Sequence, residues 1–259
     1  MDEPFTIILH GWLERINTTW VNDTISKLIQ HRGGCVFFMD YSNYSTQWNY
    51  FDLVSHFDGL SALLTKKMHQ IGNYERQLCY GFSFGARLCV DAGINVGEQQ
   101  IGRMDLCELT GPGFGPIWFF WPNPRARDPK LASKNTQCIN TSTDKGTYVY
   151  NCHQNFRMGN CGTRQPAAGA YPLGSHGLCP YFYNSAFEHK FVSNNYFKCA
   201  SANEAKNVSD VQMGYLGHEN RHSLRGDIFV ATAEFPPYLV VNDVIDNKLL
   251  KPAEIKEKL

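Results

Sequence analysis

The sequence lacks an excess of charge, a long apolar run and any internal repeat. Lysine plus arginine and aspartate plus glutamate both total 24, so no net charge attracts a nucleic acid over a distance. No stretch approaches the roughly 20 apolar residues of a membrane-spanning helix. The first residues, MDEPFTIILHGW, have no basic signal-peptide region. Nucleic acid is not an expected partner, and either a leader has been removed or the chain never had one.

The composition is that of an ordinary globular protein. Apolar residues make up 43% and charged residues 19% of the 259 residues, which excludes disordered and coiled-coil classes. A chain of this length buries a sizeable core. We expect one domain over residues 1–259.

The nine cysteines favour an oxidising compartment only weakly, and their odd number leaves at least one thiol unpaired within the monomer. Cys79, Cys89 and Cys107 lie within expected core elements, where buried free thiols are the favoured interpretation. Cys152 and Cys161 are candidates to close a loop, although spacing does not determine connectivity. With a single histidine between these two and no second ligand pair, we expect no metal and no cofactor.

N-glycosylation sequons are more frequent than chance predicts. Five are present, against about two expected from this composition, and they permit glycosylation if the chain is secreted. The five asparagines are Asn17, Asn22, Asn43, Asn140 and Asn207. We therefore expect a secreted, extracellular protein.

Strand and helix patterns alternate over the first 110 residues. Short apolar runs predict strands at residues 5–12, 35–42, 76–83 and 101–109. Apolar residues at helical spacing predict helices at residues 17–33, 49–72 and 85–96. This alternation predicts a doubly wound, mostly parallel sheet flanked by helices. From about residue 120 onward the pattern weakens into loops rich in glycine, asparagine and proline.

The segment GFSFG at residues 81–85 lies between an expected strand and an expected helix, which is the setting of a nucleophile elbow. Sites in such sheets lie at the carboxyl ends of the strands. The HGW segment, Ser83 and Glu108 all fall at those ends, so they are expected to converge on one edge of the sheet. Asp105 lies within the strand and would face the side opposite to Glu108.

Four ordered motifs carry a resemblance to a known family. IILHGW, YGFSFGARL, IGRMDLCELTGPGF and GSHGLCPYFYNSAF resemble segments of the neutral lipase family, which includes pancreatic lipases, phospholipases A1 and insect yolk proteins. The resemblance runs from about Phe5 to Tyr238. It implies an α/β-hydrolase fold with a short lid and no C-terminal β-sandwich domain. The family's N-terminal strands have no counterpart in this chain.

The resemblance implies a site residue by residue. Ser83 matches the nucleophile, His176 the catalytic histidine and Glu108 the acid, while Trp12 and Phe84 match the backbone donors of the oxyanion hole. Such a triad implies hydrolysis of lipid acyl esters. The implied partners are a lipid or other acyl-ester substrate, or a bound apolar ligand, with possible contact at a membrane interface.

Three departures from the family pattern keep a second function open. Glu108 stands where the family usually has aspartate, Phe82 where it has histidine, and Asn140 where it has a further histidine. A glycan at Asn140 would obstruct the site. The alternative is a catalytically impaired homologue that binds or stores a lipid or small ligand, or serves a structural role.

Overall fold

The computed structural model describes residues 3–114, 126–147, 151–170, 174–193, 209–219 and 225–240. Within them, nine strands form one sheet in the order β2-β1-β3-β4-β5-β6-β9-β7-β8. The strands are β1 (Phe5–Leu9), β2 (Cys35–Met39), β3 (Gln77–Phe82), β4 (Ile101–Cys107), β5 (Ser133–Asn140), β6 (Gln154–Met158), β7 (Phe191–Ser193), β8 (Ser209–Val211) and β9 (Gly226–Val230). Strand pairs from β2 to β9 are parallel, and β7 is antiparallel to both of its neighbours.

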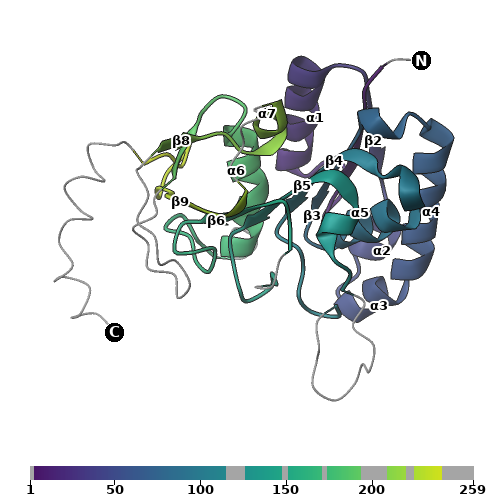
Figure 1. Cartoon of the computed structure of the whole chain (residues 1–259). Helices are drawn as coiled ribbons and strands as arrows, with labels where there is room; N and C mark the ends of the chain where they lie inside the picture. Colours follow the sequence, from purple (N-terminus) through teal and green to yellow (C-terminus); the bar gives the residue numbers. More distant parts are fainter. Residues whose placement is uncertain are drawn as a thin grey trace.

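Helices cover both faces of this sheet. Figure 1 shows α1 and α6 on one face and α4 and α5 on the other. The α-helices are α1 (Thr19–Arg32), α2 (Ser42–Ser45), α3 (Tyr50–Ser55), α4 (Phe57–Ile71), α5 (Phe84–Asn95), α6 (Cys179–Ser185) and α7 (Gly214–Glu219). The short 3₁₀ helices are η1 (Tyr74–Arg76), η2 (Gly97–Gln99), η3 (Pro129–Leu131) and η4 (Ser175–Leu178).

The sheet's central strands are apolar along their length because both of their faces are covered. In β1, Ile7 and Leu9 belong to the core beneath α4 and α5, whereas Ile8 belongs to the core beneath α1 and α6. All three side chains are fully buried. The expected doubly wound sheet is confirmed.

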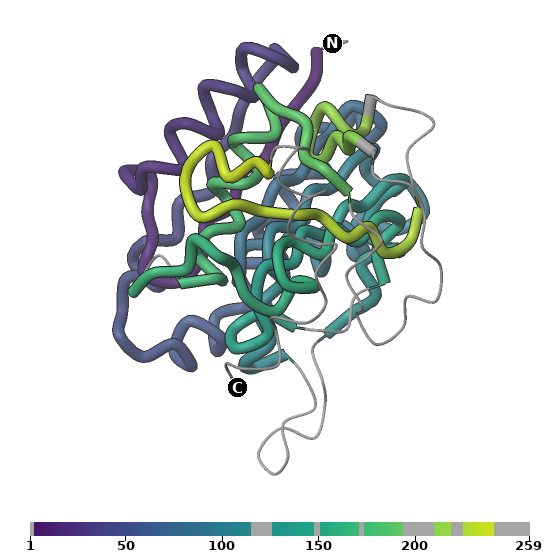
Figure 2. The backbone as a smooth tube through the Cα atoms, turned by 90° about the vertical axis from the view of Figure 1, so that its left-hand side faces the viewer, coloured from purple at the N-terminus to yellow at the C-terminus, as the bar shows by residue number. Residues whose placement is uncertain are grey.

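Parallel pairing brings the carboxyl ends of the strands to one edge. Leu9 pairs with Gly81, and Phe82 pairs with Cys107, so the residues that follow β1, β3 and β4 lie side by side. At the end of the sheet formed by β9, β7 and β8, the pairing with β7 is antiparallel. In Figure 2 the yellow C-terminal strand β9 runs across the front of the view, on the side that is to the left in Figure 1.

The single helix expected at residues 49–72 is wrong, because two helices, α3 and α4, meet at His56. Both Ser55 Oγ and His56 Nδ1 hydrogen-bond to the carbonyl of Asp52, at 2.6 Å and 2.9 Å. Side-chain bonds to the backbone compete with the helical ladder at such positions. Asn49 caps the start of α3.

The interpretation of the core cysteines as free thiols is wrong. Cys79 on β3 is bonded to Cys89 on α5, and Cys107 is bonded to Cys179 at the start of α6. Each helix packs on the strand that carries its partner, and Cα separations of 6.1 Å and 5.7 Å result. Sequence patterns assign each cysteine to an element without showing which elements touch.

The loop closure between Cys152 and Cys161 is also wrong. Cys152 is bonded to Cys138 of the neighbouring strand β5, with a Cα separation of 5.9 Å, and Cys161 is disulfide-bonded elsewhere. The expected unpaired thiol is the exposed Cys35. Disulfides are typical of oxidising compartments.

The side chain of Asn140 is only 1% exposed at the end of β5, so the folded chain offers no room for a glycan at this sequon. Asn17, Asn22 and Asn43 are exposed, and Asn207 lies outside the described residues. No helix in the described parts of the chain combines the length and apolarity needed to span a bilayer.

Candidate active site

Ser83 occupies a sharp turn between β3 and α5. Its backbone has φ 56° and ψ −114°, a positive-φ conformation that a serine adopts only when its surroundings enforce it. The N–H of Ser83 donates to the carbonyl of Cys107 at 2.9 Å, which ties the turn to the end of β4. This is the geometry of a nucleophile elbow.

The two glycines of GFSFG allow the strand and helix to approach closely. A Cβ at Gly81 would lie 2.6 Å from the carbonyl oxygen of Gly85, and one at Gly85 would lie 2.5 Å from that of His10. Real Cβ atoms do not come so near a backbone oxygen. Close packing therefore requires glycine at both positions. The Ser83 side chain, between them, lines a cavity.

His176, on η4, lies beside this serine. Its Nε2 is 2.8 Å from Ser83 Oγ. When the serine O–H donates to Nε2, the histidine proton lies on Nδ1. Nδ1 is sealed from solvent and has no hydrogen-bond partner among the residues that the structure describes. A buried N–H without an acceptor costs about 1–3 kcal/mol. A carboxylate that accepted a hydrogen bond from Nδ1 would remove this cost.

Glu108 follows β4, but its carboxylate is hydrogen-bonded to another part of the site. Oε2 accepts hydrogen bonds from the N–H and the hydroxyl of Thr141 and, at 2.9 Å, from the N–H of Ser142. The residue is fully buried and has a positive φ of 55°. Gly146 packs against the other carboxylate oxygen. Glu108 thus anchors the turn that spans residues 141–146.

That turn carries the charges that act on the histidine. The pKa of His176 is lowered to about 3, chiefly by burial and then by the Lys145 ammonium, while the Asp144 carboxylate opposes both. Asp144 and Lys145 also line the cavity at Ser83. His176 is accordingly uncharged near neutral pH, which leaves Nε2 free to accept the serine proton.

The two expected oxyanion donors lie on either side of the elbow. Phe84 is the first residue of α5, so its N–H has no acceptor within the helix. Trp12 follows the end of β1, lines the cavity and is held by its indole N–H, which donates to the carbonyl of Gln47 at 2.7 Å. The arrangement can present two N–H groups to a developing oxyanion.

A cavity of about 380 Å³ opens at Ser83 and His176. Its walls are mainly aromatic and apolar. The remaining lining includes Trp12, Leu13, Trp20, Tyr50, Phe82, Pro112 and Tyr181. Phe82, which stands where the resembled family has histidine, places its ring 5.1 Å from the His176 ring and 5.7 Å from the Trp20 ring.

Two features identify the fold. A serine elbow follows the third strand of a parallel sheet, and a histidine from a segment after β6 contacts that serine. The chain has the α/β-hydrolase fold. No protein-family profile matches the chain, and no curated protein matches it either.

Several solved α/β-hydrolases show distant structural likeness. An extracellular α/β-hydrolase from a Paenibacillus species matches with 16% identity and a TM-score of 0.33, over 42% of this chain and 42% of that one. A hydrolase of the α/β superfamily from Xanthomonas campestris matches with 12% identity and a TM-score of 0.39, over 61% and 75%. The mouse α/β hydrolase domain-containing protein 10 matches with 19% identity and a TM-score of 0.31, over 43% of each chain.

The matched region covers less than half of the Paenibacillus and mouse proteins. At these levels of similarity, the assignment of the α/β-hydrolase fold rests on the sheet order and the elbow of this chain.

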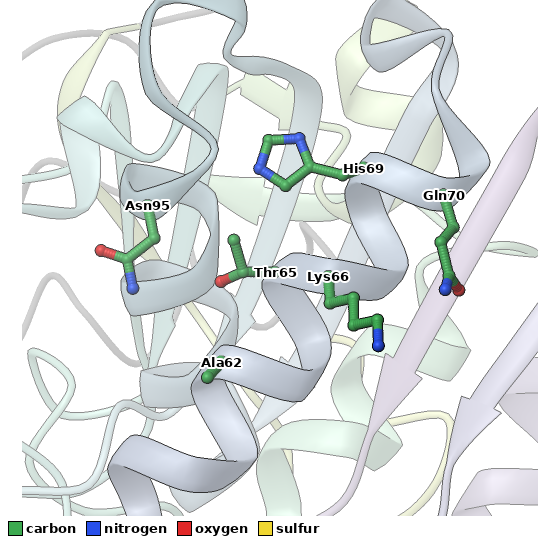
Figure 3. A pocket seen from close by; sticks show the side chains of 6 residues that line it. All are labelled: Ala62, Thr65, Lys66, His69, Gln70 and Asn95. Carbon is green, nitrogen blue, oxygen red and sulfur yellow. The ribbon is translucent and has the colours of Figure 1, made fainter.

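A second hollow, of about 570 Å³, lies on the outer side of the α/β-hydrolase core (Figure 3). It is shallow and open, and its lining comes from α4 and the end of α5. In Figure 3 the side chain of Gln70 points away from Asn95, so the polar groups do not converge. None of its residues lines the cavity at Ser83.

Sequence reasoning missed three residues of this α/β-hydrolase site. Asp144 and Lys145 follow β5, and Glu14 follows the HGW segment; all three line the cavity. Only their position in the sequence could have indicated them, because each comes shortly after a strand that ends at the same edge of the sheet. Asp105, the carboxylate expected to face the side opposite to Glu108, bonds to His218 and does not line the cavity.

Proposed function

We propose that this chain is a secreted serine ester hydrolase of the lipase or phospholipase A1 type. The observation that carries the proposal is the 2.8 Å contact between Ser83 Oγ and His176 Nε2, made at an elbow that opens into an apolar cavity. A hydroxyl is a weak nucleophile until an adjacent base takes its proton.

The proposed reaction has two halves. Ser83 Oγ attacks the ester carbonyl while His176 Nε2 takes the serine proton, and the N–H groups of Trp12 and Phe84 stabilise the tetrahedral oxyanion. Collapse of this intermediate breaks the ester bond, and His176 returns the proton to the leaving alcohol. A water then repeats the sequence on the acyl-serine and releases the acid.

Glu108 is the proposed acid of this triad. Transfer of the serine proton creates an imidazolium in a site that disfavours charge, so a carboxylate is needed to stabilise it. Glu108 holds the 141–146 turn beside His176, and it is itself fully buried. Asp144 is the alternative carboxylate, since it raises the pKa of His176 against the effect of burial.

Lipid acyl esters are the proposed substrates because of the surface around the cavity. Tyr50 lines the cavity, and the neighbouring Phe51 and Trp48 are 52% and 84% exposed. Exposed aromatic side chains beside an apolar opening fit contact with a lipid interface. The disulfides are consistent with an extracellular location.

A second candidate is a catalytically impaired homologue that binds an apolar ligand. The observation that favours it is His176 Nδ1, which finds no hydrogen-bond partner in the described part of the chain, while the Glu108 carboxylate is bonded to Thr141 and Ser142. Such a protein would keep the cavity and lack turnover.

Labelling with a fluorophosphonate probe tests both candidates. An active serine forms a covalent adduct at Ser83, located by mass spectrometry, and the Ser83→Ala variant forms none. Absence of an adduct in folded wild-type protein would contradict the hydrolase and leave the ligand-binding candidate.

A further inference from the structure

Glu14 is a carboxylate at the cavity that the proposed triad does not use. Its Oε2 accepts the N–H of Gly11 at 2.7 Å, and its Oε1 accepts the indole N–H of Trp20 at 2.7 Å. Its backbone carbonyl accepts the hydroxyl of Ser45 at 2.9 Å. One residue therefore joins the loop after β1 to α1 and α2.

This loop carries the Trp12 N–H, which is one of the proposed oxyanion donors. His10 Nδ1 donates to the carbonyl of Gly11 at 2.9 Å. Because the peptide bond is planar and trans, a fixed Gly11 carbonyl directs the Trp12 N–H the opposite way. Glu14 holds the preceding peptide through the Gly11 N–H. The two side chains thus set the orientation of consecutive peptide planes.

Packing leaves this loop little freedom to adjust. A Cβ at Gly11 would lie 3.1 Å both from Glu14 Oε2 and from the Phe82 ring. Leu13 has a positive φ of 61° and donates its N–H to the carbonyl of Ser45 at 2.7 Å. A loop so restrained depends on each of its anchors.

The chemistry of the Glu14 contacts selects the ionised carboxylate. Each oxygen accepts one N–H, and an ionised carboxylate accepts such bonds more strongly than a neutral carboxyl does, so protonation would weaken both contacts. Among the described residues no cation pairs with Glu14, and its titratable neighbours are three phenols, those of Tyr41, Tyr80 and Tyr181. Burial raises the pKa of Glu14 to about 7, while the bonds from Trp20 and Gly11 oppose that rise.

We propose that the ionised Glu14 carboxylate positions the oxyanion-hole loop, so that turnover at Ser83 is fast only while Glu14 is charged. The inference rests on the proposed hydrolase function and adds a pH gate to it. Activity should rise as the pH increases through about 7, because Glu14 loses its proton there, and the change should be reversible. The pKa of His176, lowered to about 3, would place a histidine-controlled limb far below this one.

The test is the pH profile of kcat for a soluble short-chain ester, from about pH 4 to about pH 9. Glu14→Gln keeps the size of the side chain but never ionises, so its profile loses the limb near pH 7. We expect its kcat at alkaline pH to be about tenfold to a hundredfold below wild type, as for a displaced oxyanion donor. KM should change less than kcat.

Two further variants keep the test decisive. Trp20→Phe removes the N–H that lowers the Glu14 pKa, so the limb should move to higher pH. Glu75→Gln, which alters an exposed glutamate paired with Lys134, should leave the profile unchanged. Thermal unfolding checks that each variant is folded. If Glu14→Gln does not fold, the Trp20→Phe profile decides, and an unmoved limb overturns the inference.

The outcomes separate the inference from the function on which it rests. Wild-type protein with neither hydrolysis nor a fluorophosphonate adduct overturns the proposed function. A wild-type enzyme that hydrolyses esters, together with a folded Glu14→Gln variant that keeps the same kcat and the same limb, overturns only the role of Glu14.

Discussion

Two histidines of this molecule have opposite surroundings. His218 Nε2 is 2.6 Å from the Asp105 carboxylate, and its Nδ1 accepts the amide of Asn135 at 2.9 Å. His176 Nε2 lies 2.8 Å from the Ser83 hydroxyl, and within the described ranges its Nδ1 has no hydrogen-bond partner. Both nitrogens of His218 are satisfied, and neither it nor Asp105 lines the cavity.

The difference shows what separates a structural pair from a reactive one. A buried histidine–carboxylate pair whose hydrogen bonds are all formed has no nitrogen free to exchange a proton with a substrate, although its residue types are those of a catalytic triad. Reactivity needs a nucleophile in a strained turn, a nitrogen with capacity left and space for a ligand. Only the Ser83 and His176 side of the comparison combines these features.

Removing the reactive histidine should give the largest effect. Because His176 is the proposed base, we expect His176→Ala to lower kcat/KM for a soluble ester by about 10⁴-fold or more. Hydrolysis rates on protein verified by circular dichroism measure this. A loss of less than about tenfold would break the comparison, since His176 would then be as inert as His218.

Removing the structural carboxylate should affect stability instead. Asp105→Ala leaves the His218 N–H and the Tyr183 hydroxyl, which donates to Asp105 at 2.8 Å, without an acceptor. We expect the free energy of unfolding in urea to fall by about 3–5 kcal/mol. The exposed Asp23→Ala should change it by less than about 0.5 kcal/mol. The rate per folded molecule should be retained, and a selective loss of rate would contradict a purely structural role.

The acid of the triad can be assigned by comparing Glu108→Gln with Asp144→Asn. We expect the former to lower kcat by about a hundredfold, because Glu108 is the carboxylate that we propose supports the His176 imidazolium. The latter should cost about threefold or less, since Asp144 lies on an exposed part of the turn. The reverse ranking in single-turnover acylation rates would assign the role to Asp144.

The smallest effect should come from the exposed aromatic side chains that neighbour Tyr50 in the sequence, at the cavity. Trp48→Ser should lower the rate on vesicles or emulsified ester about threefold to tenfold, because less apolar surface enters the interface. The rate on a dissolved ester should not change. Leu63→Ser, which alters an exposed apolar side chain on α4, is the matched control, and equal effects of both variants would exclude a specific contact.

The sequence predicted the parts of this molecule that local patterns encode. The four strands up to residue 107 and the helices between them were predictable because a buried parallel sheet requires apolar runs and helical crossovers, although residues 49–72 form two helices in place of one. The elbow at Ser83 was predictable because Gly81 and Gly85 leave a sequence signature. The resemblance placed His176, whose contact with Ser83 joins segments 93 residues apart.

What the sequence did not predict depends on contacts between elements. The pairing of Cys79 with Cys89 requires knowing that α5 lies on β3. The orientation of the Glu108 carboxylate depends on the backbone of residues 141–142. No local pattern distinguishes Glu14, because its role depends on two donors in different elements.

The disulfide between Cys79 and Cys89 encloses the whole GFSFG segment. Ser83 is thus a member of a small covalent ring, closed across ten residues of sequence, and such closure reduces the freedom of the unfolded chain. In an oxidising medium this ring holds the turn; after reduction only hydrogen bonds and packing do. Protein prepared with strong thiol reductants would therefore contain the same motif without the disulfide that closes the ring. Assays of ester hydrolysis should be done on the oxidised protein.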